Sequence, residues 1–172
     1  MHKPKDEDNN IVFHNSTLGT LSLTEVIEAI KQFLEEFPKS EYGLVIGTDS
    51  HEHMEGKGSL TVVTAIVVHR KGFGGRYFWK KSSFPKPRSL RDKIYTETLE
   101  SLSFAALFVP LFQKALNGAE PNYNLEIHVD VGEHGSTREM IKEVVGMVTG
   151  SGFHAKIKPE SYGASYVADK HT

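Results

Sequence analysis

The sequence predicts an α/β protein built on a mixed five-stranded sheet with helices on its faces. Three strand-like stretches, residues 43–49, 60–69 and 75–81, are separated only by short connections that contain glycine, which favours hairpins. Two later stretches, residues 124–131 and 154–158, each follow a helical segment, as strands reached through a crossover do. We therefore expect three antiparallel strands followed by helical crossovers.

The N-terminal part predicts an extra helix before the sheet. Ser22 and Glu25 have the spacing of a capping box, and the apolar residues that follow recur three and four positions apart up to about Pro38. The preceding polar stretch, residues 1–10, is expected to be a disordered tail. Residues 11–172 are long enough to form a single domain with its own core.

The strands and helices that follow differ in how deeply they should be buried. The second strand is apolar on both of its faces, which indicates a central strand covered on both sides. Residues 89–117 form a long helix that is apolar almost all round after Leu102 and should pack against the sheet. Ser136 and Glu139 suggest a second capping box, and a helical turn from about Ala164 ends the chain.

Composition narrows the class of protein. With 38% apolar and 24% charged residues the chain resembles an ordinary soluble domain, and we expect no membrane-spanning segment and no membrane partner. The absence of cysteine excludes disulfides and thiolate metal sites, and the polar N-terminus does not resemble a signal peptide, so a cytoplasmic location is expected.

One stretch carries enough positive charge to contact a polyanion. The net charge of −2 gives no overall attraction to nucleic acid, so any such contact needs a local cluster. In the segment KKSSFPKPRSLRDK six of fourteen residues are basic: Lys80, Lys81, Lys86, Arg88, Arg91 and Lys93. Considered by itself, such a run is better explained by a solvated loop, because short charge runs are common.

Two predicted strands end in an aspartate, LVIGTD with Asp49 and EIHVD with Asp130. If these strands are parallel neighbours, both side chains lie about 4.8 Å apart at the edge of the sheet where α/β proteins bind ligands. Taken alone, each aspartate is better explained as a turn residue at a strand end. The two aspartates become candidate site residues because the predicted topology brings them together.

A third carboxylate should come from the long helix. Glu97 borders the face that the helical periodicity turns toward the sheet, and Glu100 lies about 60° further round, so Glu97 is the better candidate. Asp169, on the terminal helical turn, is a fourth candidate. Two carboxylates 4 Å apart repel by roughly 4 kcal/mol at an effective dielectric near 20, so such a cluster needs protons or cations. Mg²⁺ or Mn²⁺ suits a set of oxygen ligands.

The sequence resembles the YkuK family of ribonuclease-H-like proteins, a bacterial family without an assigned function. The stretches that carry the resemblance are IGTDSH, LRDKIYTETLES, IHVDVGEHGSTREMIKEVVGM and AKIKPESYGAS, and together they cover nearly the whole chain after the tail. The resemblance implies a ribonuclease-H-like fold with a metal site formed by Asp49, Glu97 and Asp130. It places Asp169 where the last helix of such proteins often supplies an acid, although here only three residues follow it.

The expected function is that of a divalent-metal-dependent nuclease, in which Mg²⁺ or Mn²⁺ activates water for attack on a phosphodiester of RNA or DNA. The basic stretch leads into the helix that carries Glu97, so its cations could hold the phosphate backbone beside the acids. Two alternatives stay open. The chain could be a binding or regulatory module that keeps the fold without cleaving, or it could act on a small nucleotide.

Overall fold

The computed structural model describes residues 11–162, 166–167 and 170–171. The predicted tail, residues 1–10, lies outside this described part. The elements are, in chain order, β1 (Val12–Asn15), β2 (Gly19–Ser22), α1 (Leu23–Glu36), β3 (Tyr42–His53), β4 (Ser59–Arg70), β5 (Gly74–Pro85), α2 (Leu90–Leu116), β6 (Tyr123–His128), the 3₁₀ turn η2 (Arg138–Met140), α3 (Ile141–Gly150) and β7 (His154–Lys156).

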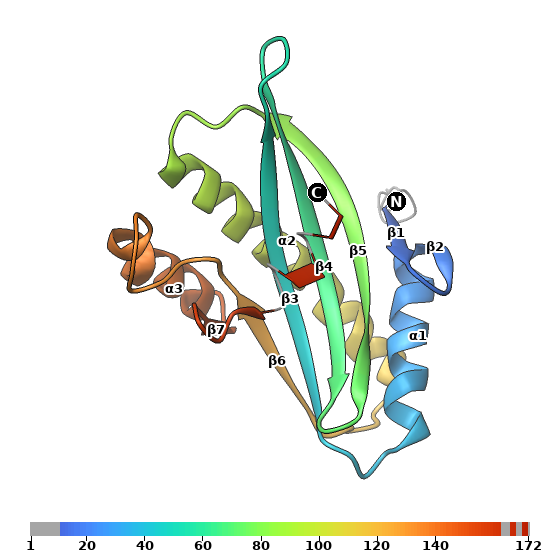
Figure 1. The fold of residues 1–172 in the computed structure, drawn as a ribbon. Coiled ribbons are helices and arrows are strands. Elements are labelled where there is room, and N and C mark those ends of the chain that lie inside the picture. Colours follow the sequence, from blue (N-terminus) through green and yellow to red (C-terminus); the bar gives the residue numbers. More distant parts are fainter. Residues whose placement is uncertain (1–10, 163–165, 168–169, 172) are drawn as a thin grey trace, which may run out of the picture.

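The strands form one seven-stranded mixed sheet in the order β2-β1-β5-β4-β3-β6-β7 (Figure 1). β3, β4 and β5 are antiparallel and twelve residues long, whereas β6 pairs parallel to β3 and β7 parallel to β6. This confirms the predicted α/β class and all five predicted strands. The predicted strand count was too low, because β1 and β2 form an additional antiparallel hairpin at the β5 edge.

Helices α1, α2 and α3 contribute to one apolar core with one face of the sheet, which we call the α2 face. The sheet residues of that core include Leu44, Ile46, Ile66, Phe78 and Ile127. Strand residues alternate between faces, so Thr48 and Ser50 also point toward α2. The tight fit depends on small residues in α2, since Ser101 and Ala105 are almost wholly buried there.

The opposite face, which we call the C-terminal face, is covered by the end of the chain. Trp79 lies directly across from Ala65 on this face, and the His171 ring stacks on Trp79. Figure 1 shows this final segment crossing the sheet on the side away from α2. Val63 and Ala65 are buried here although they do not belong to the α2-face core. Helical residues 166–167 belong to this covering segment, so the sheet has helical structure on both faces.

By length and composition alone, α2 is apolar enough to cross a membrane, which the sequence analysis did not anticipate. Its packing explains the composition in another way. The helix buries Phe104, Phe108 and Phe112 against the sheet, with the last two rings stacked, and it also buries Glu97. These contacts are those of a core helix, since membrane-spanning helices rarely carry a carboxylate.

The two predicted capping boxes have different outcomes. Ser22 accepts a hydrogen bond from the Glu25 N–H, and the Glu25 carboxylate accepts one from the Ser22 N–H at 2.7 Å, so the first box caps α1. The second prediction is wrong, because the chain enters η2 and then α3, and neither has a side-chain cap. Ser136 therefore does not cap a helix, whereas Ser22 does.

These caps predict a measurable difference between two serines. Ser22→Ala should lower the free energy of unfolding by about 1 kcal/mol, because it leaves a backbone N–H of α1 without its acceptor. Ser136→Ala, its matched control, should change that free energy by less than about 0.5 kcal/mol. Urea denaturation of both variants checks this. Equal losses would show that the cap at Ser22 contributes nothing special.

Candidate acidic site at the end of β6

The candidate site lies where β6 ends and β3 continues past its last paired residue. The parallel register pairs Ile46 with Ile127 and Gly47 with His128, which is the last residue of β6. Asp49 and Asp130 each lie two residues beyond this last pair. The predicted parallel arrangement of the two aspartate-bearing strands is thus present. Asp130 lies just beyond the sheet, while Asp49 is still within β3.

Glu97 reaches this point from the α2 face. The Ser50 hydroxyl donates a hydrogen bond to Glu97 Oε1 at 2.6 Å, and both side chains are buried. Asp49 points to the C-terminal face, since it precedes Ser50 in the strand, and its Oδ1 accepts a hydrogen bond from the Ser50 N–H. The two acids therefore approach β3 from opposite faces, next to the edge that β6 leaves exposed.

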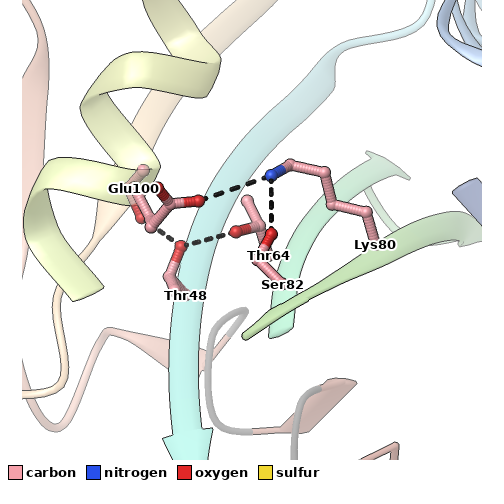
Figure 2. Close-up of polar contacts among 6 residues, drawn as sticks. Thr48, Thr64, Lys80, Ser82 and Glu100 are labelled. Carbon is pink, nitrogen blue, oxygen red and sulfur yellow. Dashed lines mark hydrogen bonds and ion pairs between the residues drawn. The ribbon is translucent and has the colours of Figure 1, made fainter. Parts of the chain in front are cut away.

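A polar layer between α2 and the sheet fixes the position of Glu97. One turn after Glu97, the Ser101 hydroxyl donates to Thr48 Oγ1 at 2.8 Å, and Thr48 donates to Thr64 Oγ1 at 3.2 Å. Figure 2 shows this chain, with Lys80 reaching from β5 to Glu100 and Ser82 beside it. Because these groups are buried, a shift of α2 along β3 would leave several of them without partners.

The Glu97 carboxyl is mostly protonated at neutral pH. Burial is the main cause that raises its pKa from 4.5 to about 8, and only 4% of the residue is exposed. The hydrogen bond from Ser50 and the charge of Lys93 oppose this increase, whereas the negative charges of Asp49 and Asp130 add to it. Both aspartates are therefore close enough to act electrostatically on Glu97.

Asp130 has a cation beside it. The Lys158 ammonium lies 2.9 Å from Asp130 Oδ1. The backbone holds Lys158 in place, because its N–H donates to the Val131 carbonyl at 2.8 Å and its side chain passes over Gly132, where a Cβ would come within 3.1 Å of it. A proton on Glu97 and an ammonium at Asp130 thus reduce the negative charge of the cluster.

The buried His128 that precedes Asp130 belongs to the supporting structure. Its Nε2 lies 3.1 Å from Glu126 Oε2, and the Tyr162 ring packs edge-on against it. Burial is the main cause that lowers the pKa of His128, which favours the neutral ring at neutral pH.

The three acids have suitable ligand atoms for a divalent cation, but their side chains are not arranged around a common point. Their donors are carboxylate oxygens, which Mg²⁺ and Mn²⁺ prefer. Within the described residues, however, no three His, Asp or Glu side chains are arranged to hold a metal ion. Glu97 is turned to Ser50 and Asp130 to Lys158. The fourth candidate, Asp169, lies outside the described part of the chain.

The six basic residues do not form one surface. Lys80 lies on the α2 face, mostly buried beside Glu100 at 3.4 Å, and Arg91 pairs with Glu143. Lys81 points to the C-terminal face, because it shares a cross-strand row with Asp49. The remaining three follow β5 into the first turn of α2: Lys86, Arg88 and Lys93. Of these, Lys93 is close enough to Glu97 to act on its pKa.

Sequence reasoning missed Ser50 and Lys158, which both contact the acids directly. Ser50 left a usable signal, since alternation places residue 50 on the α2 face whenever Asp49 is on the other. No sequence pattern indicated Lys158, because its contact with Asp130 depends on the path of the chain after β7.

The raised pKa of Glu97 predicts a pH-dependent stability difference. Between pH of about 4.5 and 8 the native state holds a proton on Glu97 that the unfolded state releases, so stability falls by up to about 1.4 kcal/mol per pH unit through this group. Glu97→Gln keeps an acceptor for Ser50 and cannot ionise. Its stability relative to the wild type should therefore rise steadily from pH 5 to pH 8, as measured by urea denaturation. A constant difference across that range would contradict the protonated state.

Comparisons with known proteins agree with the fold. The family model for Ribonuclease H-like proteins matches residues 25–172. The chain is 32% identical to the "Uncharacterized protein YkuK" of Bacillus subtilis (strain 168), in an alignment that covers 95% of this chain and 98% of the relative. No solved structure matches the chain. The chain therefore belongs to the ribonuclease-H-like proteins and, within them, to the YkuK family.

Proposed function

We propose that this protein hydrolyses phosphodiester bonds of nucleic acid with Mg²⁺ or Mn²⁺ held by Asp49, Glu97 and Asp130. The observation that carries the proposal is geometric: the buried Glu97 on α2 accepts a hydrogen bond from Ser50, the neighbour of Asp49 in β3, and Asp130 follows the strand that pairs parallel to β3. Such a gathering of acids is costly to fold, and a ligand cation is the usual reason to keep it. Membership of the ribonuclease-H-like family supports a nucleic-acid-related activity.

The residues divide the task in the following way. Asp49 and Asp130 flank the open edge of β3 and would supply carboxylate oxygens to the cation, while Glu97 joins them once it loses its proton. A bound divalent ion would activate water and stabilise the leaving oxygen. Ser50 positions Glu97 in the absence of the ion, since its hydroxyl donates to the carboxyl. Lys158 has to leave Asp130, and its ammonium is then available to a phosphate oxygen.

The basic residues next to the site would hold the phosphate backbone. Lys93 lies on the same first turns of α2 as Glu97, and Lys86 and Arg88 are exposed just before the helix. Phosphate contacts of this kind position a nucleic acid without reading its sequence. Lys80 and Arg91 have carboxylate partners and are the weaker candidates for this role.

A binding or regulatory module is the second candidate function. It is favoured by the proton on Glu97 and the ammonium at Asp130, because these let the cluster exist without a metal. In that case the acids would be a structural feature of the fold, and the basic residues alone would contact nucleic acid. The two candidates differ in turnover, not in binding.

The substitution Asp49→Asn tests the catalytic proposal. It removes one ligand charge and should reduce Mn²⁺-dependent cleavage to the level measured in EDTA. Labelled single-stranded, duplex, hybrid and branched RNA and DNA should be tried as substrates. Glu55→Gln, an exposed acid in the β3–β4 hairpin, is the matched control and should retain activity. Equal cleavage by wild type and Asp49→Asn would end the proposal, and binding without turnover on every substrate would favour the module.

Lys158 provides a separate test of metal binding. Lys158→Met removes the ammonium that competes for Asp130 while keeping a side chain that can pass over Gly132. Because a partly exposed ion pair contributes about 0.2–1 kcal/mol, Mn²⁺ affinity should rise about 1.4- to 5-fold. Isothermal titration calorimetry measures this, with Lys142→Met on α3 as a charge-matched control. An unchanged dissociation constant would show that no cation competes with Lys158.

A further inference from the structure

The C-terminal face carries a cluster of aromatic and basic residues in register with Asp49. Cross-strand pairing runs from His14 through Trp79 and Ala65 to Gly47, and the next row on the same face runs from Lys81 through Val63 to Asp49. Strands lie about 4.8 Å apart, so the Lys81 and Asp49 backbones are about 10 Å apart. The cluster therefore lies beside the acidic site and on the same side of the sheet as Asp49.

Trp79 offers a flat ring that already holds a stacked partner. The His171 ring lies 3.6 Å from it, centroid to centroid, at an interplanar angle of 10°. Tyr77 and His14 surround the indole at 5.7 Å and 5.6 Å in tilted arrangements. A nearly parallel contact at this separation is the geometry in which a nucleic-acid base stacks on an aromatic side chain.

The charges around this stack are those of an anion-binding surface. Lys81 is exposed on the row next to Trp79, and Lys170, which precedes His171, is exposed as well. No ion pair involves Lys81 or Lys170 in the described part of the chain. The His171 Nε2 is buried there without a hydrogen-bond partner. Two exposed lysines thus lie around the stacked rings of Trp79 and His171.

We propose that Trp79, together with His14, Lys81 and Lys170, binds single-stranded nucleic acid. One base stacks on Trp79 in the place that His171 occupies, and the adjoining phosphates contact Lys81 and Lys170. A single strand is required because a duplex keeps its base faces stacked on one another and cannot present one to an indole. This inference rests on the proposed function only in taking nucleic acid as the ligand, and it does not need cleavage.

The protein supplies its own probe for the test, since Trp79 is the one tryptophan in the sequence. Wild-type protein in EDTA is titrated with oligo-dT and oligo-U of about 12 nucleotides, a length within the range that aromatic and basic single-strand sites cover. Tryptophan fluorescence should change to saturation. Fluorescence anisotropy with labelled strands gives the dissociation constants, and a duplex of the same length should bind more weakly.

Variants separate stacking from charge. Trp79→Leu should weaken single-strand binding about tenfold or more, and Trp79→Phe should weaken it less, because a phenyl ring still stacks. Lys81→Ala should reduce the slope of log affinity against log salt by about 0.7, the value for one phosphate contact on a single strand. His171→Ala vacates the stacking position and should strengthen binding. Lys142→Ala, a charge control on α3, should change nothing, and circular dichroism verifies that each variant folds.

Unaltered binding by folded Trp79→Leu, unchanged tryptophan fluorescence at saturation, or no binding of any strand would overturn the inference. Because these measurements contain no metal, they are independent of catalysis. Trp79-dependent binding without cleavage under any metal condition would remove the proposed nuclease activity and leave this inference standing. If cleavage is metal-dependent but binding is unaffected by substitution of Trp79, the proposed nuclease activity stands and this inference is wrong.

Discussion

The buried hydrogen bond from Ser50 to Glu97 is the interaction on which the arrangement of the site depends. It belongs to a polar layer in which Ser101 and Thr48 make the next contact one helical turn further along α2. Buried polar groups lose free energy when they lack partners, so this layer fixes where α2 lies along β3 more strictly than apolar packing does. Since Ser50 follows Asp49 in the chain, the same constraint brings the Glu97 carboxyl beside a second acid.

The end of β6 adds a third acid to Glu97 and Asp49. Among the described residues, β6 pairs with β3 only as far as Gly47, so side chains from both faces of the sheet can approach the same edge beyond it. Asp130 follows directly, and its charge and that of Asp49 both disfavour ionisation of Glu97. The protein tolerates the cluster with a proton on Glu97 and the Lys158 ammonium at Asp130. A divalent cation would replace both, which connects the folding constraint to the proposed activity.

Sequence reasoning succeeded where a local pattern determines the outcome and failed where distant segments meet. Helical periodicity correctly indicated that Glu97 faces the sheet. The strand ends were predicted wrongly, because β3 continues past Asp49 to His53 and β6 ends two residues before Asp130. The hairpin of β1 and β2 was missed since each strand has only four residues, too few for alternation to be evident. The basic run looked continuous in sequence, yet β5 turns Lys80 and Lys81 to opposite faces. Stacking of His171 on Trp79 joins residues that are far apart in the sequence and has no local signature.

The most direct measurement is anomalous diffraction from a crystal of the protein soaked in Mn²⁺. The account predicts an anomalous peak at the edge of β3 between the Asp49 and Asp130 carboxylates, with Glu97 turned away from Ser50 and Lys158 displaced from Asp130. If Mn²⁺ binds elsewhere or not at all, while the Ser50–Glu97 and Lys158–Asp130 contacts persist at saturating metal, the acids are structural and the proposed chemistry is wrong.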